Sequence, residues 1–444
     1  MKSGMARCDL TYLIGVRIIF VILEVIMKIR FCLMAVVGLA FLSTGFASVT
    51  NVYYVDPVNN PNIVAVVAAA APSSTVYVAR GKYTITSTIA PPNGVRIIGE
   101  TGNFNDVVID GQNKCRVITA NKGNAYIANI TITGGKVTGS SSSRTYGAGL
   151  YLTAGGVVTN CRITACSSGN YVSGVGLFLQ NSYAYDSLID SCVNSPSSET
   201  TAAHRTKGFA VTLNQASVME RCRVINNRMT YGRPDSNYWG GALAIANNEN
   251  EDYSSSCIVR NCEIAHNVYE NYTRNATGTT FGGIGVSVSA GIIENCTVVS
   301  NVVLNTTDDS TVGAYGAVCY HSKNGTIRNC HIVDNLYVGT AQNHSTVSTH
   351  GGHKNYRNRF VYCVTYPAND YLASSTIIAK DSKYRFACSG KIKLERDSPC
   401  VNAGQMQSWM TGARDLYGKD RVRYDKVDIG AVEWMPSGFT LMLK

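Results

Sequence analysis

Several side chains that can carry acid–base or metal chemistry lie in the middle of the chain, between residues 249 and 353. Asp308 and Asp309 form a carboxylate pair, and His350 and His353 flank two glycines shortly before two arginines. Paired carboxylates and histidines are the groups that general acid–base catalysis uses most often. These four residues are therefore the catalytic candidates, although a chance assembly of surface charges explains the same pattern.

A second acidic group suggests a cation site. Glu249, Glu251 and Asp252 lie within four residues of one another, and calcium in proteins takes several carboxylate oxygens. No strict Asp-x-Asp spacing occurs there. We retain the three residues as candidate calcium ligands, and calcium is the one cofactor that the sequence suggests.

Aromatic side chains recur in the same part of the chain. Flat apolar rings with amides, hydroxyls and a few charges suit sugar rings, which need a surface to stack on and directional partners for their hydroxyls. Ordinary polar loops of an extracellular protein have the same composition. The predicted binding residues are Tyr238, Trp239, Tyr269, Tyr272 and Arg274.

A repeat must position all of these side chains. Seven cysteines recur at intervals of 31, 30, 40, 34, 34 and 33 residues, each within a short β-branched, alternating phrase. A fixed period of this size marks a repeat architecture, and the alternation favours strands over helices. We therefore predict an all-β solenoid, a parallel β-helix whose insertions emerge along one edge. The predicted cysteine ladder comprises Cys161, Cys192, Cys222, Cys262, Cys296, Cys330 and Cys363.

Asparagine forms a second predicted ladder. It falls five residues after the cysteine in four successive repeats, at Asn227, Asn267, Asn301 and Asn335. Stacked rungs lie about 4.8 Å apart, so a repeated amide can bond to its own neighbours above and below. The cysteines are expected to be reduced, core-facing thiols, because in-register side chains hold their β-carbons further apart than a disulfide prefers. A disulfide chain is the alternative that an exported protein would favour.

The N-terminus resembles a leader. Lys28 and Arg30 precede the apolar stretch 31–41, and small residues at 45–47 fit a signal peptidase site. We expect residues 1–47 to be a signal peptide and translation to begin at Met27; a membrane anchor built from residues 10–26 is the alternative. Removing this leader takes five basic and two acidic residues from a net charge of +10, which leaves about +7. So diffuse an excess fits an anionic glycan and argues against a nucleic-acid partner.

The segment after the leader, together with the Asn-Cys rungs, resembles the right-handed parallel β-helix proteins of the pectate-lyase-like superfamily. The residues that carry the likeness are the strand 51–56, an N-terminal helical cap over 60–71, the β run 75–85 and the rungs to about residue 380. Lyases of that superfamily imply bound calcium and a basic catalytic residue. Its hydrolases imply paired aspartates, a histidine between glycines and an Arg-x-Lys, which Asp308–Asp309, His350, His353 and Arg357–Arg359 follow only loosely.

The C-terminal end resembles the choice-of-anchor Q domain of bacterial surface β-helix proteins. Three ordered motifs carry this likeness: Ser398-PCVNA-Gly404, Asp415-LYGKD-Arg421 and Val427-DIGAV-Glu433. It implies an exported protein associated with the bacterial envelope. The predicted domains are the leader (1–47), the β-helix (48–389), the anchor-like domain (390–434) and a tail (435–444).

These observations predict a secreted or surface-attached monomer whose function is binding or display at the bacterial envelope, with polysaccharide as its ligand. A polysaccharide lyase or glycoside hydrolase acting through the carboxylates is the alternative function. A structural adhesin stalk is the second alternative. No nucleic-acid partner is expected. Contact with a membrane is expected only through the leader or an anchor.

Overall fold

The fold is described from a computed structural model of the chain. It describes residues 51–140, 143, 145–196, 208–230, 241–245, 257–270, 283–288, 290–304, 316–320, 325–338, 343–345, 360–366, 368 and 372–436. The leader lies outside these residues. Among them, no helix is long and apolar enough to cross a membrane.

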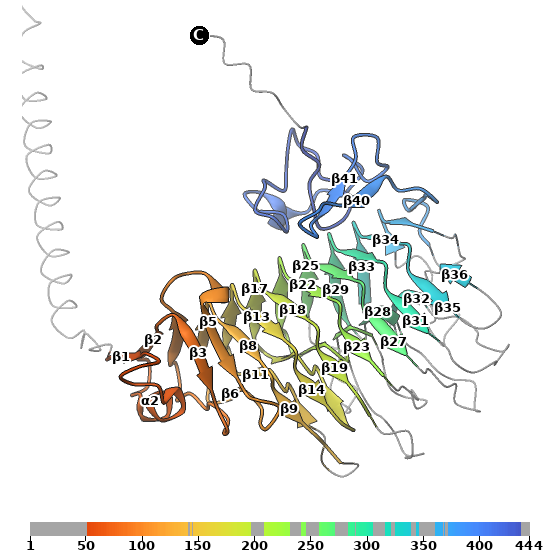
Figure 1. Cartoon of the computed structure of the whole chain (residues 1–444). Helices are drawn as coiled ribbons and strands as arrows, with labels where there is room; N and C mark the ends of the chain where they lie inside the picture. Colours follow the sequence, from red (N-terminus) through yellow and green to blue (C-terminus); the bar gives the residue numbers. More distant parts are fainter. Residues whose placement is uncertain are drawn as a thin grey trace, which may run out of the picture. The chain divides into compact units, whose positions relative to one another are not determined.

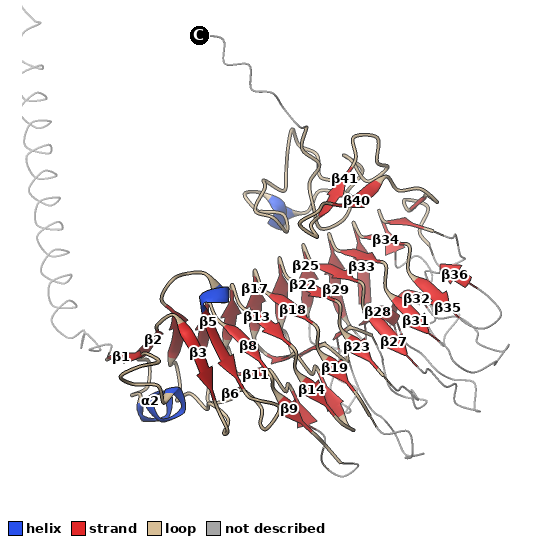
Figure 2. Cartoon of the chain, in the orientation of Figure 1, coloured by secondary structure: helices blue, strands red, loops and turns tan. Residues whose placement is uncertain are grey.

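Four stacked sheets, named here sheets 1 to 4, make up most of the described chain (Figures 1 and 2). Sheet 1 contains β1 (Val52–Val55), β2 (Thr75–Val78), β4 (Arg96–Gly99), β7 (Tyr126–Ala128), β12 (Val157–Thr159), β17 (Tyr183–Tyr185), β21 (Val218–Glu220), β25 (Ile258–Arg260), β29 (Gly291–Glu294), β33 (Gly325–Arg328) and β37 (Phe360–Val361). Sheet 2 contains β3 (Gly81–Thr84), β5 (Val107–Asp110), β8 (Thr131–Thr133), β13 (Arg162–Thr164), β18 (Leu188–Asp190), β22 (Arg223–Ile225), β26 (Glu263–Ala265), β30 (Thr297–Val299), β34 (His331–Val333), β38 (Val364–Thr365) and β39 (Ile377–Ile378).

The other two sheets complete each turn. Sheet 3 contains β9 (Lys136–Val137), β14 (Ser167–Ser168), β19 (Val193–Asn194), β23 (Arg228–Met229), β27 (Val268–Glu270), β31 (Val302–Leu304), β35 (Leu336–Val338) and β36 (Asn343–Ser345). Sheet 4 contains β6 (Ile118–Ala120), β11 (Leu150–Thr153), β16 (Leu177–Gln180), β20 (Val211–Asn214), β24 (Leu243–Ile245), β28 (Gly283–Val288) and β32 (Gly316–Tyr320). The chain visits sheets 4, 1, 2 and 3 in turn and then returns to sheet 4 one rung further on.

This winding makes the protein a parallel β-helix, as the repeat predicts. Every pairing within the four sheets is parallel except that of β36 with β35. Parallel crossovers are right-handed in nearly all proteins, which is the hand that the resemblance implies. The residues between sheet 3 and sheet 4 form the edge from which the insertions emerge.

Alternation along the short strands fills the interior. From β2 onward, each sheet 1 strand has an inward-pointing residue that is fully buried, for example Val76, Ile127, Met219 and Ile293. The residues next to it along the strand point outward. Burying a Val or Ile side chain contributes roughly 1.5–3 kcal/mol, so this stacked apolar column is a main source of stability.

The cysteine column differs from the prediction at one rung. Cys161, Cys222, Cys262, Cys296, Cys330 and Cys363 occupy it, but the register of β13, β18 and β22 places Ser187 between the first two. The Ser187 hydroxyl accepts the Cys161 N–H at 3.1 Å, as the Cys262 sulfur accepts that of Cys222. Assigning Cys192 to this column was therefore wrong.

Cys192 belongs instead to the asparagine column. The pairing of β14, β19 and β23 aligns Cys166, Cys192 and Asn227. Asn227, Asn267, Asn301 and Asn335 follow in order, and each amide nitrogen donates to the next amide oxygen at 2.8–3.0 Å. All four are buried, so the ladder satisfies polar groups that water does not reach.

The twelve cysteines whose side chains the structure describes are free thiols. In the first column each sulfur lies 3.1–3.5 Å from the carbonyl oxygen two residues earlier. These thiols fill the corner between sheets 1 and 2, where a small side chain fits.

The N-terminal end is covered by the short helix α2 (Ile63–Ala69), which is shorter than the predicted segment 60–71. Asn62 caps it by accepting the Ala65 N–H at 3.1 Å. Ile63 and Val67 are its buried residues. The apolar side of the helix therefore packs against the first rungs of the solenoid.

The last parallel strand, β39, ends at Ile378. Residues 382–436, here called the C-terminal segment, contain the antiparallel pair β40 (Tyr384–Phe386) and β41 (Ile392–Leu394) and the 3-10 turn η2 (Ser408–Met410). Residues 382–389 thus lie with this segment rather than with the solenoid. The segment packs on the outer face of sheet 2 and shares an apolar cluster with Ala265, Val299, Val333 and Val364.

Candidate functional site

Most of the predicted site residues lie outside the described residues. Those residues are Tyr238, Trp239, Tyr272 and Arg274 of the binding set, the catalytic candidates Asp308, Asp309, His350 and His353, and the calcium candidates Glu249, Glu251 and Asp252. Among the residues that the structure does describe, no group of three His, Cys, Asp or Glu side chains could hold a metal ion.

Tyr269 is the one predicted binding residue that the structure places. It lies on β27, is 5 % exposed and packs with its ring centroid 6.0 Å from that of Phe209. Its ring therefore faces the core, and this placement does not present it to a sugar.

The insertion edge itself is described at its first two rungs. There the chain forms the short parallel pair β10 (Thr145–Tyr146) and β15 (Val172–Ser173), between sheet 3 and sheet 4. These two insertions precede those that contain Tyr238, Trp239, Tyr272 and Arg274. They show how side chains from this edge meet the outer face of sheet 4.

Three aromatic rings gather at this place. Tyr151 and Phe178 are paired across β11 and β16 and point outward from sheet 4. Tyr146 approaches both, with its ring centroid 6.0 Å from that of Tyr151 and 4.4 Å from that of Phe178. Phe178 is buried beneath the other two, so Tyr146 and Tyr151, both half-buried, supply the accessible surface.

Arg116 is fixed beside this cluster. Its guanidinium donates to the carbonyl oxygens of Tyr146 and Gly147 at 2.8–3.2 Å and to the Thr119 hydroxyl at 3.2 Å. It also lies 5.5 Å from the Tyr151 ring centroid. Burial lowers the pKa of Arg116, but a guanidinium remains cationic at neutral pH.

This arrangement can bind and does not by itself catalyse. Half-buried tyrosine rings and an adjacent cation offer stacking, hydroxyl and charge contacts to a sugar. Burial raises the pKa of Tyr151, and Tyr146 raises it further, so its hydroxyl stays protonated and donates. Tyr146, Tyr151 and Arg116 were missed in the sequence because the insertion that contains Tyr146 is short, and because Arg116 and Tyr151 come together only through the register of β6 and β11.

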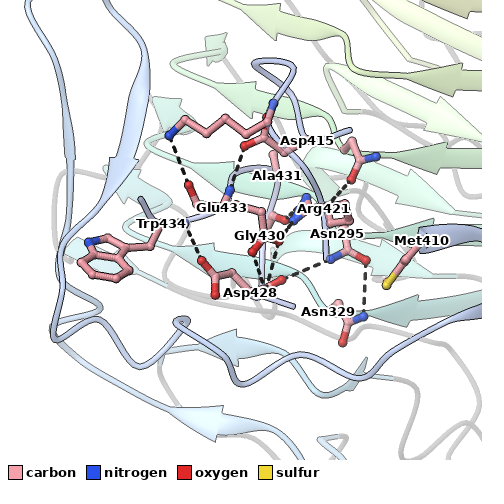
Figure 3. Close-up of polar contacts among 12 residues, drawn as sticks. Asn295, Asn329, Met410, Asp415, Arg421, Asp428, Gly430, Ala431, Glu433 and Trp434 are labelled. Carbon is pink, nitrogen blue, oxygen red and sulfur yellow. Dashed lines mark hydrogen bonds and ion pairs between the residues drawn. The ribbon is translucent and has the colours of Figure 1, made fainter. Parts of the chain in front are cut away.

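A second cluster, in the C-terminal segment, contains several buried charged side chains (Figure 3). Arg421 is fully buried and donates to Glu433 Oε1 at 2.6 Å, to the Gly430 carbonyl at 2.8 Å and to Asn261 Oδ1 at 3.0 Å. Burial raises the pKa of Glu433 to about 8, against the opposing effect of Arg421. Charges buried this deeply are tolerated only when paired and hydrogen-bonded.

The cluster joins all three C-terminal motifs. Asp415 accepts the Tyr417 and Lys419 amides at 2.8 Å and, through its other oxygen, that of Glu433 at 2.9 Å. Asp428 accepts the amide of Asn402 at 2.7 Å. Because these carboxylates already hold backbone donors, they fix the fold of the segment and leave no free catalytic pair among these residues.

Three asparagines tie this segment to the solenoid. Asn261, Asn295 and Asn329 occupy the left-handed corner between sheets 1 and 2, with φ of 53°, 48° and 52°. Their amides donate to the carbonyl oxygens of residues 414, 428 and 405 at 2.7–3.2 Å. The sequence signal was the asparagine directly before cysteine in three successive repeats.

Comparison with known proteins assigns this chain no activity. No family model and no curated protein matches the chain. Pectate lyase Pel9A is similar in structure at 14% identity, covering 86% of this chain and 96% of its own, with a TM-score of 0.42. The pectin methylesterases of Aspergillus niger (12% identity, 74% and 93% covered) and Erwinia chrysanthemi (13%, 75% and 94%) each have a TM-score of 0.32. The strand topology therefore defines the chain as a parallel β-helix protein, and likenesses this distant assign it no reaction.

Proposed function

We propose that this chain is an exported, envelope-associated β-helix protein that binds polysaccharide along its insertion edge. The observation that carries the proposal is the cluster of Tyr146, Tyr151 and Phe178 with Arg116 at the first described insertions. Its rings match the apolar faces of sugars, and its cation favours a glycan that carries carboxylates.

Export and anchoring are parts of the same proposal. The leader pattern at residues 1–47 supports export. The likeness of residues 390–434 to the choice-of-anchor Q domain supports envelope attachment. In this proposal the segment is held firmly against the solenoid by Arg421 and the three corner asparagines, so that the β-helix is presented as one unit with its anchor.

A glycan array followed by affinity electrophoresis in polygalacturonate gels tests the binding. Tyr146→Ala with Tyr151→Ala is expected to weaken retention about thirtyfold, since each of the two lost stacking faces carries on the order of 1 kcal/mol. Tyr424→Ala is the matched control, because that tyrosine is 89 % exposed on the C-terminal segment and lies outside the cluster. Unchanged retention in the double variant would contradict the proposal and favour a structural stalk.

An ultraviolet-absorbance assay for unsaturated sugar products tests the enzymatic alternative on the same protein. Under the binding proposal no acidic polysaccharide is depolymerised, with or without added calcium. Turnover that disappears in an Asp308→Asn, Asp309→Asn double variant would replace the proposal by a lyase or hydrolase function.

A further inference from the structure

The outer face of sheet 1 carries tyrosines at its N-terminal end that no part of the insertion edge uses. On β1, β2, β7 and β17 they point outward, since the alternating residues of these strands point into the core. We call this surface the tyrosine face. Its rings belong to Tyr54, Tyr77, Tyr126, Tyr183 and Tyr185.

Strand register arranges these rings in two columns. Tyr54 and Tyr77 are direct partners, with ring centroids 5.7 Å apart and planes at 24°. Tyr183 and Tyr185 stand on one strand with nearly parallel rings, 6.4 Å apart and at 5°. The face therefore presents ordered rings along the stack and also across it.

The spacing along the stack is regular. Tyr126 and Tyr183 share a column with Val157 between them, so they lie two rungs apart, or about 9.6 Å. That length spans two residues of an extended, β-1,4-linked sugar chain. Apart from Arg96, the remaining outward residues of β4, β7 and β12 are short or aliphatic, namely Ile98, Ala128, Val157 and Thr159.

The face is almost neutral. Of the outward positions on β1, β2, β4, β7, β12 and β17, only Arg96 is charged, and its guanidinium lies 4.6 Å from the Tyr126 ring centroid. A nucleic acid would need many cations here, and a basic or acidic protein surface would need counter-charges. Flat rings with phenolic hydroxyls and little charge are complementary to a neutral glycan.

The same sheet changes character further on. From β21 the outward column becomes Glu220, Arg260, Glu294 and Arg328, which form ion pairs, and Arg260 also lies 4.5 Å from the Trp409 ring. Tyrosine is a good strand former, so one exposed ring would mean little. Five rings confined to one uncovered, neutral part of the sheet require another reason.

We propose that the tyrosine face binds a neutral, extended β-1,4-linked polysaccharide chain lying along the axis of the stack. The chain would stack on Tyr126 and Tyr183 and reach Tyr54 and Tyr77 toward the N-terminal end. This surface lies on sheet 1 and is separate from the insertion edge of sheets 3 and 4, so the inference does not rest on the proposed function.

Binding of the purified protein to microcrystalline cellulose and to chitin, with calorimetry on cellohexaose and chitohexaose, tests this inference. The Tyr126→Ala, Tyr183→Ala double variant is expected to bind at least about tenfold more weakly, from two lost stacking faces. Tyr126→Phe with Tyr183→Phe is expected to stay within about threefold of the wild type, because the ring is kept. Tyr424→Ala, an exposed tyrosine elsewhere, is expected to bind as the wild type does.

Val157→Lys gives a test that leaves the rings and the core in place. It puts a charged side chain between Tyr126 and Tyr183, and it is expected to weaken cellohexaose binding while the melting temperature stays unchanged. The inference is overturned if the wild type binds none of the four probes, if both the alanine and the lysine variants bind normally, or if Tyr424→Ala loses as much. Polygalacturonate probes the insertion edge and cellulose probes the tyrosine face, so each proposal can fail alone.

Discussion

The outer face of sheet 2 differs between its early and late rungs, although the backbone is the same. In one outward column the early residues are Asp110, Thr133, Thr164 and Asp190, and the late ones are Ile225, Ala265, Val299 and Val333. The early residues meet solvent or surface ion pairs, whereas the late residues pack against the C-terminal segment. One outward side chain on each strand therefore distinguishes the rungs that face solvent from those that pack against the C-terminal segment.

The corner between sheets 1 and 2 shows the same contrast. On the two rungs just before the covered ones it holds Asp186 and Arg221, which pair with each other at 2.7 and 3.0 Å and are partly exposed. On late rungs it holds the buried Asn261, Asn295 and Asn329. Charges suit a corner that water reaches, and neutral amides suit one that must bond to a covering backbone.

Arg421 gives the largest expected effect on this contrast. Arg421→Met would remove the buried cation and the hydrogen bonds that it donates to Glu433, Gly430 and Asn261, and breaking such a buried pair costs about 3–5 kcal/mol. Arg221→Met, on the uncovered corner, is expected to cost about 1 kcal/mol or less. Urea unfolding midpoints and limited proteolysis of residues 382–436 measure both, and similar losses in the two variants would contradict a special role for the covered rungs.

A carboxylate placed in the outward column tests the same contrast from the solenoid side. Val299→Asp would bury a charge without a partner under the C-terminal segment, at a cost of about 3 kcal/mol. Thr164→Asp, at the equivalent uncovered position, should change the free energy of unfolding by less than about 1 kcal/mol. If Val299→Asp proves equally mild in urea melts, the segment is not docked there.

The asparagine ladder separates late from early rungs in the interior. Asn301→Ala would remove the acceptor of the Asn267 amide and of its backbone N–H, which costs about 1–3 kcal/mol. Cys166→Ala, in the same column before the ladder begins, should cost about 1 kcal/mol or less, because the thiol is small. Comparable losses in chemical denaturation would argue that column position, and not the amide chain, sets the stability.

The solenoid could be predicted because its signal is local and repeated. The Asn227-to-Asn335 spacing and the alternating strands are visible without knowing which rungs touch. Cys192 was misplaced because the intervals of 31 and 30 residues look regular, whereas Ser187 takes the position in the cysteine column. Insertions of unequal length hide such register shifts.

Two features could not be predicted from the sequence: the outer face of sheet 2 that packs against the C-terminal segment, and the tyrosine face. Both are formed by residues that lie far apart in the sequence. The late sheet 2 strands, such as Thr297–Val299, are buried at all three residues, which is typical of a sheet covered on both faces. What covers that sheet is encoded more than 100 residues later, at Arg421 and its neighbours. Tyr126 and Tyr183 lie in one column, with Val157 between them, and this follows only from the register of β7, β12 and β17.

The smallest expected effect concerns pH and the covered rungs. His331 on β34 is fully buried under the C-terminal segment, with Nε2 2.8 Å from the Ser382 hydroxyl and its ring edge-on to Tyr384 at 5.1 Å. Burial lowers the pKa of His331 to about 3. Asp334 accepts the hydroxyl of the same Tyr384 at 2.8 Å.

The sign of the pH effect follows from this shift. Exposed histidine titrates near 6.5, so the unfolded chain takes up a proton first, and the stabilisation present above pH 6.5 is lost as pH falls toward 3. The loss approaches about 1.4 kcal/mol per pH unit. Glu433, with a pKa raised to about 8, acts in the opposite direction between its unfolded pKa and 8.

The difference between the wild type and His331→Gln isolates the histidine, since the glutamine amide of that variant would keep a partner for Ser382. Urea midpoints at pH 7 and pH 5.5 should fall more steeply in the wild type than in that variant, and parallel slopes would mean that His331 does not sense the docking of the C-terminal segment.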